Sequence, residues 1–177
     1  MKISEEMMNL GNNAKKAARH LRFLSSGNKN EALGVISANI LQNKAKILEE
    51  NRKDMQFGLD KCLSDSMLDR LYIDQSRLEG IIKSLESIIK LRDPVGSLIE
   101  EFLRPNGLLI KKVRTPIGVI GVIFESRPNV TVDAGALCFK SGNASILRCG
   151  SESYNTSQAF EACFKKGFKE VGLSEES

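Results

Sequence analysis

An uninterrupted apolar run in the second half of the chain constrains the fold more than any other feature. Residues 117–124, with the sequence IGVIGVIF, contain no polar side chain and are rich in β-branched residues. Such a run is typical of a strand buried on both faces, as in a parallel sheet. We therefore expect an α/β arrangement from residue 117 onward, with helices covering that sheet.

The pattern that follows predicts a helix over 130–140, a strand over 144–148 and a second helix over 152–170. This order of strand, helix, strand and helix is half of a doubly wound α/β domain. Two parallel strands are fewer than the ~5–6 of an average sheet, and the sequence ends where a next strand is expected. We expect 117–177 to be an incomplete Rossmann-like half-domain, whose edge near 144–148 is covered by dimerisation or by the last helix.

The first part of the chain, residues 1–94, has the three- and four-residue apolar spacing of helices. The first stripe comprises Ile3, Met7, Leu10, Ala14, Ala17, Leu21 and Leu24. The second comprises Leu33, Ile36, Ile40 and Ile47, behind a capping-box pair, Asn28 and Glu31. The third runs from Leu78 to Ile89, behind Ser76 and Glu79, and stops at Asp93-Pro94. Residues 51–73 suggest shorter helical pieces between the last two.

Between these parts, residues 95–116 predict a β-hairpin, which is a candidate segment for self-association or for binding a partner. Two strand-like runs, 97–103 and 108–114, flank the turn Arg104-Pro105-Asn106-Gly107. Asn-Gly is a strong hairpin signal because both residues tolerate a positive φ. We expect the protein to be a homo-oligomer.

Composition excludes several classes of function. The net charge of +4 arises from 26 basic and 22 acidic residues, and no basic cluster is interleaved with aromatic side chains, so we expect no nucleic-acid partner. No run approaches the ~18 apolar residues of a membrane span, and no signal peptide is evident, so we expect a cytoplasmic protein. The four cysteines lack C-x-x-C spacing and there is one histidine, which argues against a metal site.

The candidate binding residues lie in two turns that each follow a predicted strand. The first turn is Glu125-Ser126-Arg127-Pro128-Asn129 and the second is Arg148-Cys149-Gly150-Ser151-Glu152. Open α/β sheets bind ligands at such strand ends, and an arginine fork beside a helix N-terminus suits a phosphate group. Alternatively, Ser151 caps a helix and Arg148 is a surface ion-pair partner. Gly118 and Gly121 do not form a dinucleotide fingerprint and suggest close packing inside the strand.

The run TPIGVIGVIFESRPNVTVDAGALCFKSGNASILRCGSES resembles the signature stretch of the gamma-glutamyl phosphate reductase family, within the aldehyde dehydrogenase superfamily. The segment before it, DPVGSLIEEFLRPNGLLIKKVR, is similar to the hairpin segment of that family. The helical first part fits the family's N-terminal region, so the resemblance covers essentially all of the chain.

The resemblance implies NADPH-dependent reduction of gamma-glutamyl phosphate to glutamate 5-semialdehyde, in proline biosynthesis. It implies that NADP contacts Glu125, Ser126, Arg148, Ser151 and Glu152. An arginine at 148 suits the extra phosphate of NADP, because a guanidinium can pair with it in a bidentate manner. Arg127 and Asn129 match the part of the first turn that faces the substrate.

Family members are much longer, so we expect the thiol nucleophile to lie outside these residues and assign no catalytic residue within them. Cys149 stands where relatives usually carry glycine, and Gly135 replaces a usual alanine. Three interpretations remain open: a shortened, inactive reductase, one half of a split enzyme completed by another chain, and a non-catalytic protein that self-associates or binds a partner.

Overall fold

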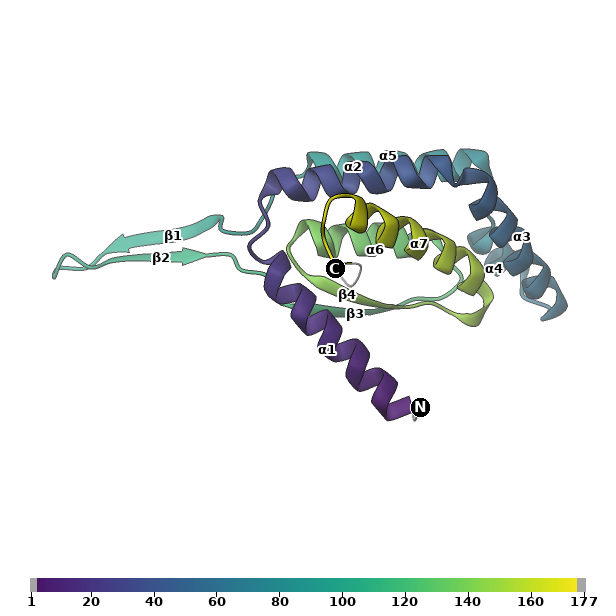
Figure 1. Cartoon of the computed structure of the whole chain (residues 1–177), viewed down its shortest axis with the longest axis horizontal. Helices are drawn as coiled ribbons and strands as arrows, with labels where there is room; N and C mark the ends of the chain where they lie inside the picture. The colour runs from purple at the N-terminus through teal and green to yellow at the C-terminus, as the bar shows by residue number, and fades with distance from the viewer. Residues whose placement is uncertain (1–2, 175–177) are drawn as a thin grey trace.

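The computed structural model describes residues 3–174, with side chains from Glu5 onward. Five helices make up the first part: α1 (Ile3–Leu21), α2 (Ser26–Gln42), α3 (Lys44–Asp60), α4 (Asp65–Leu71) and α5 (Gln75–Lys90). Helices α2 and α5 lie side by side as an outer layer, while α3 and α4 close one end of the molecule (Figure 1). Ile3, at the head of the first apolar stripe, lies outside the described side chains.

The second part follows the predicted order of strand, helix, strand and helix. It comprises β3 (Val119–Ile123), α6 (Asn129–Lys140), β4 (Ala144–Arg148), a short 3₁₀ helix η1 (Ser151–Ser153) and α7 (Tyr154–Glu170). Strands β3 and β4 pair in parallel, with α6 and α7 between them and the outer helix layer (Figure 1). The α/β class is therefore confirmed, while the division at residues 94 and 116 stays a prediction.

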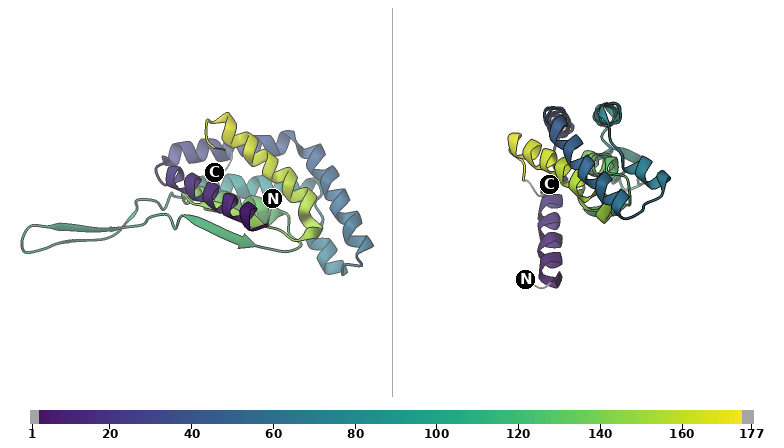
Figure 2. Two further views of the ribbon diagram at one scale, coloured as in Figure 1. Left: turned by 60° about the horizontal axis from the view of Figure 1, so that its bottom comes forward. Right: turned by 90° about the vertical axis from the view of Figure 1, so that its right-hand side faces the viewer.

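The predicted hairpin is present and projects far from the rest of the molecule (Figures 1 and 2). Its strands β1 (Leu98–Leu103) and β2 (Leu109–Val113) pair antiparallel. In the turn, Gly107 has a φ of 83°, but Asn106 does not have a positive φ. The predicted turn Arg104-Pro105-Asn106-Gly107 lies between the two strands, whose pairing ends at Leu103 and Leu109.

Helix boundaries differ from the sequence expectation in three places. Ser25, not Asn28, caps α2, since the Ser25 hydroxyl accepts a hydrogen bond from the Asn28 backbone N–H at 3.1 Å. The second apolar stripe does not form one helix, because the chain breaks at Asn43 between α2 and α3. Asp74, not Ser76, caps α5, through a bond from the Arg77 backbone N–H. In both α2 and α5 the capping side chain lies directly before the first helical residue.

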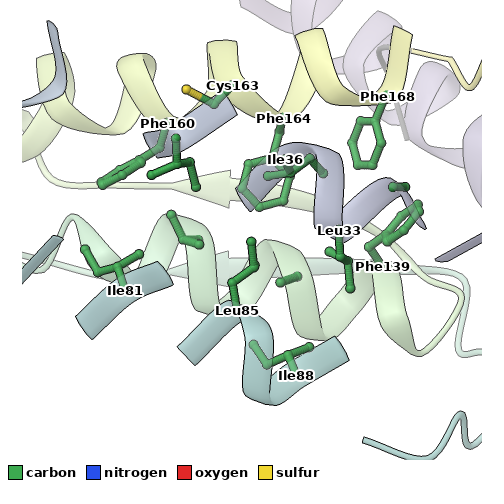
Figure 3. Close-up of a cluster of buried hydrophobic side chains, with 14 of the residues drawn as sticks. Leu33, Ile36, Ile81, Leu85, Ile88, Phe139, Phe160, Cys163, Phe164 and Phe168 are labelled. Atoms are coloured by element: carbon green, nitrogen blue, oxygen red, sulfur yellow. The ribbon is translucent and has the colours of Figure 1, made fainter. Parts of the chain in front are cut away.

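The main core lies between the outer helix layer and α7. Figure 3 shows side chains from α2, α5, α6 and α7 meeting in one cluster, among them Ile36, Leu85, Phe139 and Phe160. Because aromatic residues make up only 6% of the sequence and tryptophan is absent, aliphatic side chains fill most of this space.

Strand β3, which the apolar run at 117–124 predicted, is not buried on both faces. Ile123 is 84% exposed, and Ile117 just before β3 is 83% exposed. Within residues 3–174, β3 pairs with β4 alone, so its other edge is open, and α1 contacts β3 without covering Ile123. The outer half of α1 is similarly exposed at Met7 and Met8, and Figure 2 shows this helix projecting away from the body. Within the described chain, no helix has the length and apolar character needed to cross a membrane.

Candidate functional site

The two predicted turns meet at the same edge of the sheet. Because β3 and β4 are parallel and Ile123 pairs with Arg148, both strands end at the same level. The Phe124 backbone N–H donates to the Arg148 carbonyl at 3.0 Å, which extends the pairing by one residue. The strand ends therefore form one surface, at the place where open α/β sheets bind ligands.

In the first turn, Glu125 and Arg127 are exposed, whereas Ser126 between them is 3% exposed. Ser126 has a φ of 46°, in the left-handed region that residues other than glycine seldom adopt. This conformation turns the chain sharply from β3 toward α6. It directs the Ser126 backbone N–H and hydroxyl to the second turn, while its neighbours face solvent.

Glu152 in the second turn holds Ser126. Glu152 Oε1 accepts a hydrogen bond from the Ser126 backbone N–H at 2.7 Å and another from the Ser126 hydroxyl at 3.1 Å. Burial raises the pKa of the Glu152 carboxyl, but hydrogen bonds from its own backbone and from Ser126 outweigh this and lower the pKa below its usual value. The carboxylate is therefore charged at neutral pH.

Arg148 and Ser151 are both exposed on this surface. The Arg148 guanidinium donates to the Cys149 carbonyl at 2.7 Å. A guanidinium has five N–H donors, so most of its capacity remains available to a phosphate. Ser151 begins the 3₁₀ helix, and its side chain makes no capping bond there. The alternative in which Ser151 caps this helix is therefore wrong.

Asn129, the last residue of the first turn, borders a polar hollow that the sequence did not predict. Its side-chain amide donates to Asp133 at 3.1 Å, and Asp133 also accepts a bond from the Ser84 hydroxyl at 2.8 Å. These residues, with Arg70 and Arg77, border a hollow of about 290 Å³ between α4, α5 and α6. A sequence signal was lacking because Ser84 and Asp133 are 49 residues apart.

A buried carboxylate on α3 holds the segment that follows the second turn. Asp54 of α3 is 1% exposed and accepts four hydrogen bonds, from the backbone N–H and the side chain of both Asn155 and Thr156. These N–H groups lie in the first turn of α7, where no partner exists within the helix. Asp54 therefore caps α7 from another helix and holds the segment that carries Glu152.

A larger, mainly apolar hollow of about 460 Å³ runs along β4. Residues of α1, α6 and α7 line it together with Ile146 and Leu147 of the strand. The expected covering of this strand by the last helix is therefore only partial, because α7 borders the hollow without closing it.

Two of the four thiols are buried in a setting that disfavours the thiolate. Burial raises the pKa of Cys163 to about 11 and also raises that of Cys138. Cys62 is exposed on the side of α3 and α4, and Cys149 is half-buried in the second turn. Across residues 3–174, no three His, Cys, Asp or Glu side chains gather in a way that could hold a metal ion.

Comparison with known proteins gives a consistent result, although no family profile matches the chain. The chain is 53% identical over 169 residues to gamma-glutamyl phosphate reductase from Rhizobium johnstonii, which covers 96% of this chain and 40% of that protein. It matches the crystal structure of gamma-glutamyl phosphate reductase from Thermotoga maritima with a TM-score of 0.94 and 37% identity, over 97% of this chain and 41% of that one.

A putative aldehyde dehydrogenase from Bacillus subtilis shares the fold, with a TM-score of 0.70 at 16% identity over 96% of this chain and 34% of that one. The chain thus resembles gamma-glutamyl phosphate reductase along nearly its whole length and has a fold of the aldehyde-dehydrogenase type. It spans about 40% of the length of the curated relatives that it matches.

Proposed function

We propose that this chain is the N-terminal portion of a gamma-glutamyl phosphate reductase and carries the first part of its NADP site. The observation that supports this most directly is the convergence of the two strand-end turns through Glu152 and Ser126. It creates one polar surface at the carboxyl ends of two parallel strands, with an exposed arginine beside it. The similarity to reductases of that name supports the substrate class, gamma-glutamyl phosphate, and a cytoplasmic role in proline biosynthesis.

The exposed donors fit the chemistry of NADP. In our proposal the Arg148 guanidinium pairs with the phosphate on the adenosine ribose, and the Ser151 hydroxyl binds close to it. Glu125 and Ser126 lie at the end of β3, toward the nicotinamide. NADPH, when bound, supplies a hydride, and the role of these residues is to orient it.

The substrate would approach the first turn from the side of Arg127 and Asn129. Arg127 is exposed and offers a charge opposite to that of the acyl phosphate. Asn129 is held by Asp133, which fixes the direction of its amide. In this assignment both residues orient the substrate and neither takes part in bond making.

The chain on its own is proposed to be inactive as a reductase. Attack on an acyl phosphate requires a thiolate, with phosphate as the leaving group, and the thioester then accepts the hydride. Burial raises the pKa of the two buried thiols, Cys138 and Cys163, and so disfavours their thiolates. We therefore expect the nucleophile to come from a segment outside these 177 residues.

A titration of the chain with NADPH and with NADH, followed by cofactor fluorescence, tests the cofactor assignment. We expect NADPH to bind more tightly, and Arg148→Ala to remove most of that preference because the phosphate loses its partner. Arg52→Ala, which removes an exposed arginine from α3, is the matched control and should change neither affinity. Equal affinities for both cofactors in the unmodified chain would contradict the assignment.

Self-association through the hairpin is a second candidate function, and one observation favours it. The hairpin projects into solvent with exposed apolar side chains, namely Leu98, Ile99, Leu103, Leu108, Leu109 and Val113. Paired strands of this length are rarely stable when isolated in water. Light scattering of the chain with Leu103→Asp should then show loss of the oligomer, whereas a monomer before and after the change would exclude this role.

Completion by a second chain would preserve the enzyme class. The hollow along β4 and the unpaired edge of that strand favour this reading, since native proteins seldom leave such edges uncovered. Addition of a fragment from the remaining part of a homologous reductase should then restore NADPH oxidation by gamma-glutamyl phosphate. Activity of the chain alone would contradict the inactivity that we propose.

A further inference from the structure

The contact between Glu152 and Ser126 has a geometry that a cofactor ligand would not need. Both donors of Ser126, the backbone N–H and the hydroxyl, point at one oxygen of the Glu152 carboxylate. Ser126 is almost fully buried and keeps a positive φ, which is unfavourable for a non-glycine residue. A backbone in that conformation persists only where the surroundings hold it, and the carboxylate is the group that does so here.

The shape of the second turn places the carboxylate for this purpose. The Glu152 side chain folds back over Gly150, so that a Cβ at residue 150 would lie 2.2 Å from Oε1. Gly150 has φ −70° and ψ 159°, a conformation open to any residue. The glycine is therefore needed for the space beside its Cα, which the carboxylate occupies, and not for its backbone freedom.

The segment that carries Glu152 is held in place by hydrogen bonds to Asp54. Asp54 binds the first turn of α7 through four hydrogen bonds, directly after the 3₁₀ helix that carries Glu152. Hydrogen bonds to a charged group are among the stronger ones in proteins. A carboxylate on a segment held in this way can fix the position of a separate loop.

We propose that Glu152 is a positioning residue that clamps the turn 124–129 to the turn 149–153, in place of the direct cofactor contact that the sequence suggested. The assignment of cofactor and substrate to these turns rests on the proposed function; the clamp itself does not. Arg127 and Asn129 follow Ser126 within the same turn, so the clamp sets the direction in which these substrate-facing side chains leave the chain. Through it, the turn after β4 determines the shape of the turn after β3.

Amide hydrogen exchange, resolved by NMR at Ser126 and its neighbours, tests the clamp without any ligand. Glu152→Ala should speed exchange of the Ser126 amide at least tenfold, because its charged acceptor is lost. Glu152→Gln keeps an uncharged oxygen acceptor and should restore part of the protection. Gly150→Ala should speed exchange as much as Glu152→Ala does, although the carboxylate is still present, because the new methyl group occupies its place.

Two variants serve as controls. Gly121→Ala adds a methyl group within β3, where no atom lies within 4 Å of it, and Glu86→Gln removes an exposed carboxylate from α5. Neither should change exchange at Ser126. If Glu152 held only its own backbone N–H, Glu152→Ala would instead leave exchange at Ser126 unchanged.

Unchanged protection of Ser126 in both Glu152→Ala and Gly150→Ala would overturn the proposal. If Glu152→Ala does not fold, Gly150→Ala and Glu152→Gln decide the question. NADPH titration of the same variants separates this inference from the proposed function. Failure of every form to bind NADPH would reject the cofactor site while faster exchange still supports the clamp. Loss of NADPH binding in Glu152→Ala but not in Gly150→Ala would identify the carboxylate as a direct ligand and reject the clamp.

Discussion

Replacement of Asp54 by alanine should destabilise the chain more than any exposed change on the same helix. The carboxylate is 1% exposed and accepts four hydrogen bonds, of which the two from Thr156 are fully buried. Hydrogen bonds to a charged group contribute about 1.5–3 kcal/mol each. If only the two buried bonds are counted, the free energy of unfolding should fall by about 3–6 kcal/mol.

Urea unfolding followed by far-UV circular dichroism measures this loss. At this chain length each kcal/mol corresponds to roughly 2–4 °C, so the melting temperature should fall by about 6–24 °C. Asp60→Ala removes an exposed carboxylate from the end of the same helix and should change stability by less than about 0.5 kcal/mol. A loss of under about 1 kcal/mol for Asp54→Ala would refute the inference that this side chain caps α7.

Two further outcomes follow from buried groups. The ammonium of Lys29 is 0% exposed and lies 2.8 Å from the Asp93 carboxylate. Asp93→Ala removes its charged partner and should lower the free energy of unfolding, measured in urea, by about 3–5 kcal/mol. A loss near zero would contradict the ion pair. Because burial raises the pKa of Cys163 to about 11, its thiolate fraction stays small as the pH rises to 9, so iodoacetamide at pH 8 should label exposed Cys62 far faster. Equal labelling of the two thiols, read by peptide mass spectrometry, would contradict the burial of Cys163.

The element order could be predicted because it depends on local patterns. The apolar run at 117–124 indicates a strand, and the apolar spacing of the first part indicates helices, both without tertiary information. Burial of the strand could not be predicted in the same way. It depends on which elements cover each face, and Ile123 remains exposed because the described chain supplies cover on one side only.

The candidate site was predicted as two turns but not as one surface held by a clamp. Hydrophobic spacing and strand ends indicated where polar residues gather. The bond from Ser126 to Glu152 joins residues 26 positions apart and requires a positive φ at a serine, which no sequence rule would assign. Gly121 was predicted to be a close-packing position, yet no atom lies within 4 Å of a Cβ built there. Both the bond between Ser126 and Glu152 and the open space beside Gly121 depend on the tertiary fold, which local sequence patterns do not determine.

Thermal unfolding of the chain with and without millimolar NADPH tests the central claim, that the chain carries part of an NADP site, most directly. A ligand that binds only the folded state, at ~100 times its dissociation constant, adds about 2.7 kcal/mol of stability. At this size the melting temperature should rise by roughly 5–11 °C with NADPH, and clearly less with NADH. A cooperative melt that neither cofactor shifts would contradict the claim and favour an interaction role for the hairpin.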